Sequence, residues 1–333
     1  MKMISEHLLE PLYQTFNWHP SRILTFIGCI KSLIKYGSVS LKSLSLETPS
    51  QGKEKAHVAR VERLFALQEF DHEAMSSLVW KFLSPWADPN VILALDRTNW
   101  IMGAKDINYF VGSIIVNSVS VPLVWDVLAT KGNSNTDQRK ALMDLALSII
   151  PKDRLGMVLA DREFVGEEWF SYLVQKDVPF TIRIKANTLV QTQSGQSLAV
   201  SKLLEGKRGI VTEHVDLWGQ KLWVSLVSGK PKKDCSQELV IVASNRLQGS
   251  EALAIYRKRW GIEKGFKSMK SEGFEIERTH LKAPERLKKL MAIVAFGTAL
   301  SVATGKAKER EHPIKVKKTA ELSGLTLLTA ETI

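Results

Sequence analysis

The 333-residue sequence has few cysteines and no long hydrophobic run. Its two cysteines, Cys29 and Cys235, are far apart and have no metal-ligand spacing, which favours a reducing cytosolic compartment. The longest apolar stretch, 290–303, is shorter than the ~20 residues that a helix needs to span a bilayer. It follows Pro284, which suits a first helical turn. No charged-then-apolar leader opens the chain, so we expect a cytoplasmic protein without a membrane span.

Several familiar catalytic motifs are also missing. The seven histidines form no His-Glu-x-x-His pattern, and the sequence has no Gly-x-Ser-x-Gly elbow. It has no phosphate-cradling loop of the Walker type either, so no nucleotide cofactor is implied. Internal repeats and low-complexity tracts are likewise absent.

Positive charge is in excess and unevenly placed. The formal net charge is +11 and the isoelectric point is near 9.5, which points to an acidic partner. Residues 250–333 contain 17 basic and 10 acidic residues, whereas residues 86–149 contain 5 and 6. No basic amphipathic helix with a wide apolar face is evident, so a nucleic-acid backbone fits this distribution better than a membrane surface.

Four residues near the end of the chain, Tyr256, Arg259, Glu263 and Lys270, have the spacing Tyr-x2-Arg-x3-Glu-x6-Lys. Segment 250–273 lacks proline and has apolar residues at helical intervals, which predicts one helix. At about 100° per residue, Tyr256, Glu263 and Lys270 would share one stripe, with Arg259 beside it. A carboxylate among cations suits a polyanion held around a metal. The alternative is a solvated basic face with a core tyrosine.

Two aspartates follow apolar runs that predict buried strands. Asp96 comes after 91–95, a strand expected to end at or just beyond it, and Asp161 comes after 157–160. An amphipathic helix is predicted behind Asp161, at 167–175.

Each aspartate also has a simpler explanation. Either one could cap a strand end, where aspartate is common in turns. Either could instead form an ion pair with the arginine that follows it, Arg97 or Arg162.

Asp-x-Thr at 96–98, Asp-Arg-Glu-Phe at 161–164 and the Tyr-Arg-Glu-Lys spacing resemble the motifs of DDE transposases of the YREK-signature group. These are enzymes of bacterial insertion sequences. The resemblance implies an RNase H-like, retroviral-integrase-like α/β core that carries a β-rich insertion and an N-terminal helical domain. It also implies a bacterial protein that acts on the nucleoid.

The order of predicted elements agrees with such a core. Three β-rich runs, at 91–96, 109–117 and 121–129, suggest an antiparallel meander. A helix at 136–150 follows, then the Asp161 strand, its helix, and a strand at 180–185.

We therefore expect five regions. They are a helical DNA-end-binding domain at 1–89 (or a helical cap on the core), a first part of the catalytic core at 90–185, a β-rich insertion at 186–236 with a hairpin, a second part of the core at 237–304, and a basic tail at 305–333.

The expected chemistry is phosphoryl transfer on DNA. Clustered carboxylates repel one another unless cations neutralise them, and hard divalent ions prefer oxygen ligands. We expect Asp96, Asp161 and Glu263 to be catalytic and to bind two Mg²⁺ ions, with Mn²⁺ as a substitute. Two ions about 3.5–4 Å apart can clamp the attacking and leaving oxygens.

The expected partner is double-stranded DNA, both the inverted-repeat ends of the element and the target. The predicted DNA contacts are Tyr256, Arg259, Lys270, Arg183, Lys185 and Trp260. By analogy, the enzyme should act as a homodimer on paired ends, cutting and joining them. The alternative is a non-catalytic DNA-binding protein or repressor derived from a transposase. It is suggested by the tail after Lys318, which loses the resemblance.

Overall fold

The computed structural model describes residues 2–49, 52–102, 105–128, 132–231 and 237–312. The chain is mixed α/β and divides into two compact units. The sheet unit contains Pro89–Asp96 and Gly132–Ile262. The helical unit contains Met1–Asp88, Arg97–Lys131 and Glu263–Ile333, as far as these are described.

The sheet unit is built on strands in the order β1-β4-β5-β10-β9-β8-β6-β7. Their bounds are β1 Val91–Met102 (up to Asp96 in this unit), β4 Leu155–Ala160, β5 Phe180–Arg183, β6 Leu189–Gln191, β7 Ser197–Ala199, β8 Ile210–Leu217, β9 Gln220–Pro231 and β10 Gln237–Ser244. β1, β4 and β5 are parallel, and β10 pairs antiparallel with both β5 and β9. The strands at the centre are buried, as their apolar sequences predict.

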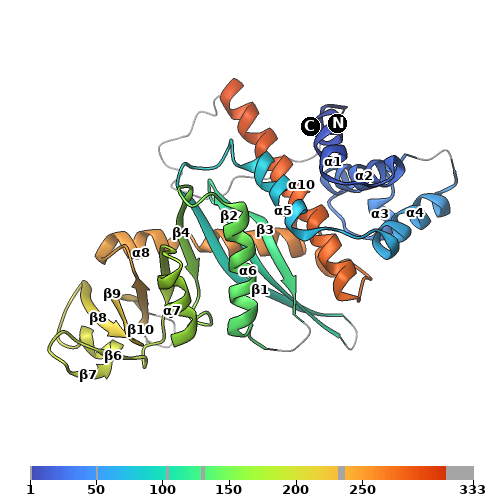
Figure 1. Ribbon diagram of the computed structural model, residues 1–333. Coiled ribbons are helices and arrows are strands. Elements are labelled where there is room, and N and C mark those ends of the chain that lie inside the picture. The colour runs from blue at the N-terminus through green and yellow to red at the C-terminus, as the bar shows by residue number, and fades with distance from the viewer. Residues whose placement is uncertain (1, 50–51, 103–104, 129–131, 232–236, 313–333) are drawn as a thin grey trace. The chain divides into compact units, whose positions relative to one another are not determined.

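Two helices of the sheet unit, α6 (Thr136–Ile149) and α7 (Glu167–Gln175), lie side by side next to β4 (Figure 1). α6 begins with a capping box in which Asn135 and Gln138 each bond the other's backbone N–H. The Tyr172 hydroxyl donates to Asp144 Oδ1 at 2.8 Å and ties α7 to α6. A third helix, α8 (Gly249–Arg257), and a 3₁₀ turn at Val200–Leu204 complete this unit.

A two-residue turn joins β8 to β9. Leu217 pairs with Gln220, and Trp218 and Gly219 between them have φ values of 54° and 75°. Positive φ at both central residues is the requirement of a type I′ hairpin turn. The predicted hairpin is therefore present, with one non-glycine residue in the left-handed region.

The helical unit is organised around α10. Its helices are α1 Lys2–Thr15, α2 Pro20–Tyr36, α3 Leu41–Leu44, α4 Glu54–Leu67, α5 His72–Leu83 and α10 Pro284–Glu311, and its strands are β2 Lys105–Val116 and β3 Val119–Val127. α10 packs against β3, α2 and α5 (Figure 1). The Tyr109 hydroxyl and the Trp125 indole donate to the carbonyls of Leu287 and Lys288, at 2.8 and 3.0 Å. These bonds anchor the start of α10 to β2 and β3.

α10 is long and apolar enough to cross a membrane, but 67% of its most hydrophobic 18-residue window is buried inside the structure. Pro284 is its first residue, as predicted. Since its apolar faces are covered by β3 and other helices, α10 has the features of a core helix.

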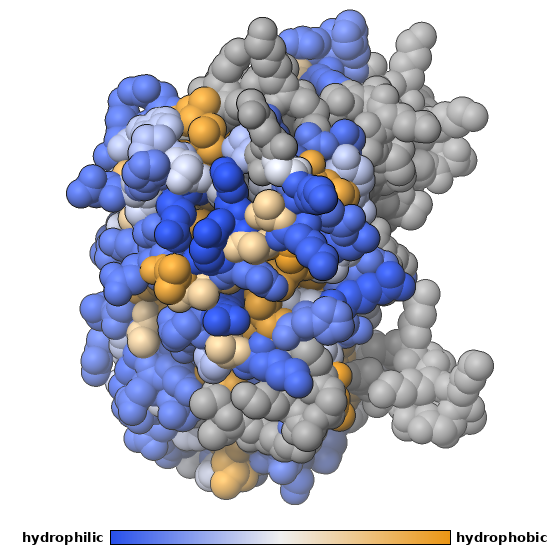
Figure 2. Space-filling view, turned by 90° about the vertical axis from the view of Figure 1, so that its right-hand side faces the viewer, coloured by the Kyte–Doolittle hydropathy of each residue, from blue (hydrophilic) through white to orange (hydrophobic). Residues whose placement is uncertain are grey.

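The face of the molecule seen in Figure 2 is mostly hydrophilic. Its hydrophobic residues lie in small separate groups among polar ones. Scattered apolar side chains of this kind are normal on a protein surface in water.

Most predicted elements are confirmed, but the strand that carries Asp96 is longer than expected. β1 continues to Met102, six residues beyond Asp96. The neighbouring strand β2 explains the extension, because it lies between β1 and β3 in the strand order and can satisfy the additional backbone groups. Asp96 is therefore inside a strand, whereas Asp161 directly follows β4.

The prediction of one helix over 250–273 is wrong. α8 ends at Arg257, α9 covers Trp260–Lys267, and a π-helical turn follows at Ser268–Glu272. Between α8 and α9, the amides of Lys258 and Arg259 bond carbonyls three residues back, which tightens the chain. A stripe at 100° per residue consequently does not run from Tyr256 to Lys270.

Candidate active site

Asp96, within β1, and Asp161, just after β4, lie at matching positions on neighbouring parallel strands of the sheet unit. The register pairs Leu95 with Ala160, so the next residue on each chain is an aspartate. Both aspartates are half-buried. This register brings the two aspartates to neighbouring positions at one end of the paired segment.

A chain of hydrogen bonds links the two carboxylates. Arg259 Nη1 donates to Asp96 Oδ2 at 3.0 Å, and Arg259 Nε donates to the Tyr256 hydroxyl at 3.1 Å. The Tyr256 hydroxyl in turn donates to Asp161 Oδ1 at 3.3 Å. Two residues of the Tyr-Arg-Glu-Lys spacing thus contact the two aspartates predicted from distant segments.

This network lies in a largely buried environment. Arg259 is 5% exposed and Tyr256 is 6% exposed. Burial raises the pKa of Tyr256 to about 12, against the opposing effect of Arg259. The hydroxyl therefore stays protonated at neutral pH and remains a donor to Asp161. The tight bend after α8 turns Arg259 inward to Asp96 rather than outward to solvent.

Glu263 and Lys270 belong to the helical unit. The Lys270 ammonium donates to the Asn99 carbonyl at 2.8 Å, pairs with Glu277 at 3.4 Å and lies 6.0 Å from the ring centre of Trp100. Glu263 is half-buried on α9. The membership of both residues in the site remains a prediction.

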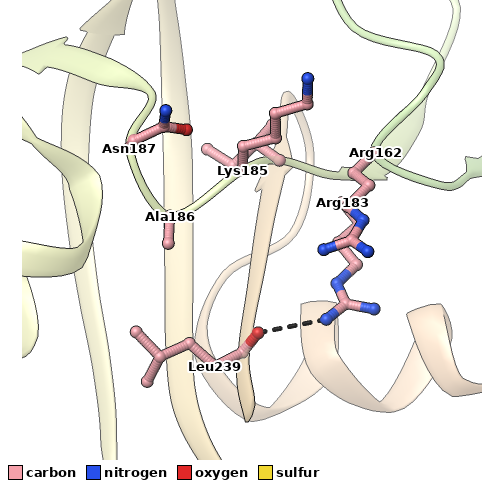
Figure 3. A pocket seen from close by; sticks show the side chains of 7 residues that line it. Arg162, Arg183, Lys185, Ala186, Asn187 and Leu239 are labelled. Carbon is pink, nitrogen blue, oxygen red and sulfur yellow. Dashed lines mark hydrogen bonds between the residues drawn. The ribbon is translucent and has the colours of Figure 1, made fainter.

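Two predicted DNA contacts, Arg183 and Lys185, line a pocket of about 390 Å³ in the sheet unit (Figure 3). The lining also includes Arg162, Ile184, Ala186, Asn187 and Leu239. Arg183 Nη2 donates to the Leu239 carbonyl at 3.2 Å, which fixes this guanidinium. Lys185 and Arg162 are exposed.

Arg162 is a residue whose role the sequence reasoning missed. The sequence suggests it only as an ion-pair partner of Asp161, yet it stands with Arg183 at one side of this pocket (Figure 3). The position of Arg162 directly after Asp161 in the sequence could have indicated that it lies near the site. Three cationic side chains with no acidic residue in the lining make this pocket suited to an anion.

Trp260 lies next to Arg259 and is 60% exposed. An exposed indole beside a buried cation is available for stacking on a base.

The model of the family described as transposase DDE domain matches residues 89–300, which is more than half of the chain. The chain belongs to the transposase DDE domain family. With the mixed α/β structure, this membership fits the RNase H-like fold class. The match includes both aspartates and all four residues of the Tyr-Arg-Glu-Lys spacing.

No curated protein sequence matches this transposase domain. Among solved structures, it is similar to the endonuclease V of Bacillus subtilis, with 9% sequence identity and a TM-score of 0.28. That match covers 57% of this chain and 84% of the other.

Transposase DDE domains generally use divalent metals, and the Asp96–Asp161 pair fits such an ion. Adjacent carboxylates offer the hard oxygen ligands that these ions prefer. Over the described ranges, however, no three His, Cys, Asp or Glu side chains gather where they could hold a metal. The structure therefore presents two carboxylates in the sheet unit that could bind such an ion, and a metal site that includes Glu263 remains a prediction.

Proposed function

We propose that this transposase domain cleaves DNA at the ends of an insertion sequence and joins those ends to target DNA, as a member of the YREK-signature group. The observation that carries the proposal is the hydrogen-bonded chain Asp96–Arg259–Tyr256–Asp161. These four residues come from the three motifs that resemble the family, and two of them bind the other two.

Asp96, Asp161 and Glu263 would hold the metal, for which we propose two Mg²⁺ ions with Mn²⁺ as a substitute. When bound, the metal would stabilise the negative charge that develops on the transferred phosphoryl group.

Arg259 and Tyr256 have a positioning role in this proposal. Arg259 fixes one oxygen of Asp96, and its second bond orients the Tyr256 hydroxyl toward Asp161. Because Arg259 is buried and bound to Asp96, we assign it primarily to holding the carboxylate rather than to a DNA phosphate. Tyr256 acts in the same way on Asp161.

The DNA contacts that the surface supports best are the cations of the pocket, Arg162, Arg183 and Lys185, together with Trp260. Phosphate contacts of this kind hold the strand without reading its sequence. Lys270 remains a proposed contact. We further propose that the protein works on DNA as a homodimer in the bacterial cytoplasm, with a helical DNA-end-binding region before the core and a β-rich insertion within it.

The test is cleavage of linear DNA that carries the element's ends, with Mn²⁺ and purified full-length protein. Asp96→Asn, Asp161→Asn and Glu263→Gln should each reduce cleavage by more than the ~10–100-fold typical of losing an outer-shell partner. DNA binding should be retained. The matched control is Asp177→Asn, which removes an exposed carboxylate that pairs with Lys152 and Arg246.

Three outcomes decide the proposal. Loss of cleavage in the three site variants, but not in the control, supports it. Cleavage that persists in all three removes them from the chemistry. Wild-type protein that binds the ends but makes no nicks would instead favour a non-catalytic DNA-binding protein.

A further inference from the structure

One buried arginine in the sheet unit has no role in the function proposed so far. Arg139, in the first two turns of α6, is 6% exposed. Its guanidinium donates four hydrogen bonds. They go to Ser134 Oγ at 3.1 Å, the Ser134 carbonyl at 2.7 Å, the Glu163 carbonyl at 2.9 Å and the Val165 carbonyl at 3.2 Å.

These bonds hold the loop that follows Asp161. The amide of Phe164 donates to the Asp161 carbonyl at 2.9 Å, so the segment from Asp161 to Phe164 forms a closed turn. Arg139 binds the carbonyls on both sides of Phe164, and the Phe164 side chain is fully buried with its ring 5.4 Å from the guanidinium carbon. The turn is thus fixed to α6 from one side and to the core from the other.

A guanidinium is suited to this position for a geometric reason. Its donors lie in one plane with fixed directions, so they can bind several carbonyls at once. A lysine at the same position would keep the charge but would offer a single ammonium that cannot span both Ser134 and the loop. Because unsatisfied buried polar groups are unfavourable, removing Arg139 leaves the carbonyls of Glu163 and Val165 in need of new partners.

We infer that Arg139 is a positioning residue for Asp161, acting through the backbone of residues 163–165. The inference rests on the proposed function, in which the Asp161 carboxylate binds the metal and must therefore be held in place. Outer-shell groups that orient a ligand typically change metal affinity or activity by 10–100-fold when they are removed.

The experiment compares Arg139→Met and Arg139→Lys with Met143→Ala in the full-length protein. Met143 lies one turn further along α6, is fully buried, and makes a control for general destabilisation of the helix. Mn²⁺ binding is measured from the electron paramagnetic resonance signal of the free ion. The turnover rate and the Kd for end DNA are measured in parallel, all at a temperature where each variant is folded.

We expect Arg139→Met to weaken Mn²⁺ binding and lower turnover by ~10–100-fold, with the Kd for DNA within about twofold of wild type. Arg139→Lys should lie between Arg139→Met and wild type, and it decides the question if Arg139→Met does not fold. Met143→Ala should bind Mn²⁺ as wild type does. A loss in the arginine variants that Met143→Ala matches overturns the inference, since general destabilisation then accounts for it.

Mn²⁺ binding by Asp161→Asn distinguishes a failure of this inference from a failure of the proposed function. If Asp161→Asn weakens Mn²⁺ binding while the Arg139 variants do not, the positioning role alone is overturned. If Asp161→Asn binds Mn²⁺ as wild type does, the metal role of Asp161 is overturned, and the inference with it.

Discussion

The two aspartates of the candidate site are held in different ways, although they lie at matching positions on neighbouring strands. Asp96 lies within the continuous strand β1 and pairs with Arg259, which is 163 residues away in the sequence. Asp161 follows the end of β4 and lies in a turn whose backbone is bound by Arg139. Its carboxylate receives one long hydrogen bond from Tyr256.

The difference shows that two carboxylates at matching positions can depend on different parts of the fold. The orientation of Asp96 depends on a buried ion pair formed by the segment between α8 and α9. The orientation of Asp161 depends on the packing of α6 against the loop that follows Asp161. Substitutions in one support should therefore act mainly on its own aspartate, with coupling through the one residue that both supports share. Tyr256 is the bridge between them.

The largest effect is expected from Arg259→Met, which would leave Asp96 partly buried without this cation. Removing one partner of a buried pair typically costs about 3–5 kcal/mol, whereas an exposed pair contributes at most about 1 kcal/mol. Urea denaturation should show that difference between Arg259→Met and Arg246→Met, whose ion pair with Asp177 is half exposed. Equal shifts in the two variants would contradict the buried role of Arg259.

A double variant sharpens this test. Replacing both members of the pair, as Arg259→Met with Asp96→Leu, removes the buried charge as well as its partner. Much of the lost stability should return, because well-packed apolar replacements of buried ion pairs are often neutral or better. A double variant no more stable than Arg259→Met would mean that packing, rather than charge, explains the loss.

An intermediate effect is expected from Tyr256→Phe, and it should depend on pH. The folded pKa of Tyr256, about 12, lies above the ordinary value of 10. The folded state therefore keeps a proton that the unfolded state releases, so this stabilisation is complete below pH 10 and is lost as the pH rises to about 12. This stabilisation amounts to at most about 3 kcal/mol.

Urea unfolding at pH 8, 10 and 11 measures this contribution. Wild type should lose more stability than Tyr256→Phe over that range, while Tyr109 and Tyr172, whose pKa values burial also raises, contribute equally to both proteins. At pH 8 the variant should be less stable by about 1 kcal/mol, for the lost hydrogen bonds. Parallel alkaline curves would show that this hydroxyl is not in a buried network.

The smallest effect on stability is expected at the pocket cations. Arg162→Ala and Lys185→Ala change exposed side chains, so the free energy of unfolding should move by less than about 0.5 kcal/mol. DNA binding should weaken, and the slope of log K against log salt should fall by about 1 for each phosphate that a variant no longer neutralises. Lys221→Ala, an exposed residue paired with Asp216, is the control and should leave the slope unchanged.

Much of the local structure could be predicted from the sequence. The apolar run before Asp161 became β4, and residues 167–175 form the expected helix. The helix predicted at 136–150 is α6, and Asn135, the residue before it, caps it. These features depend on residues that are close in the sequence, through hydrophobic periodicity and side chains that bond the adjacent backbone. They can therefore be predicted from the sequence pattern.

The prediction of one helix over 250–273 was wrong because a contact with a distant segment, rather than local periodicity, decides the structure there. Its periodicity is helical throughout, but Arg259 bonds Asp96, and the chain tightens between α8 and α9 where this cation turns inward. Nor does any sequence pattern mark Arg139, since its partners are backbone carbonyls of another segment. Interactions between residues remote in the chain are not encoded in local spacing.

From the amino-acid sequence alone, the two aspartates, the signature residues and a basic character that suggests a nucleic-acid partner could be predicted. Which of these residues contact one another became clear only from the fold. It set Asp96 beside Asp161 through the parallel register of β1 and β4, and it directed Arg259 and Tyr256 to those carboxylates. The physical reason is that a buried charge is stable only with partners in place, and their positions follow from packing of the whole sheet unit.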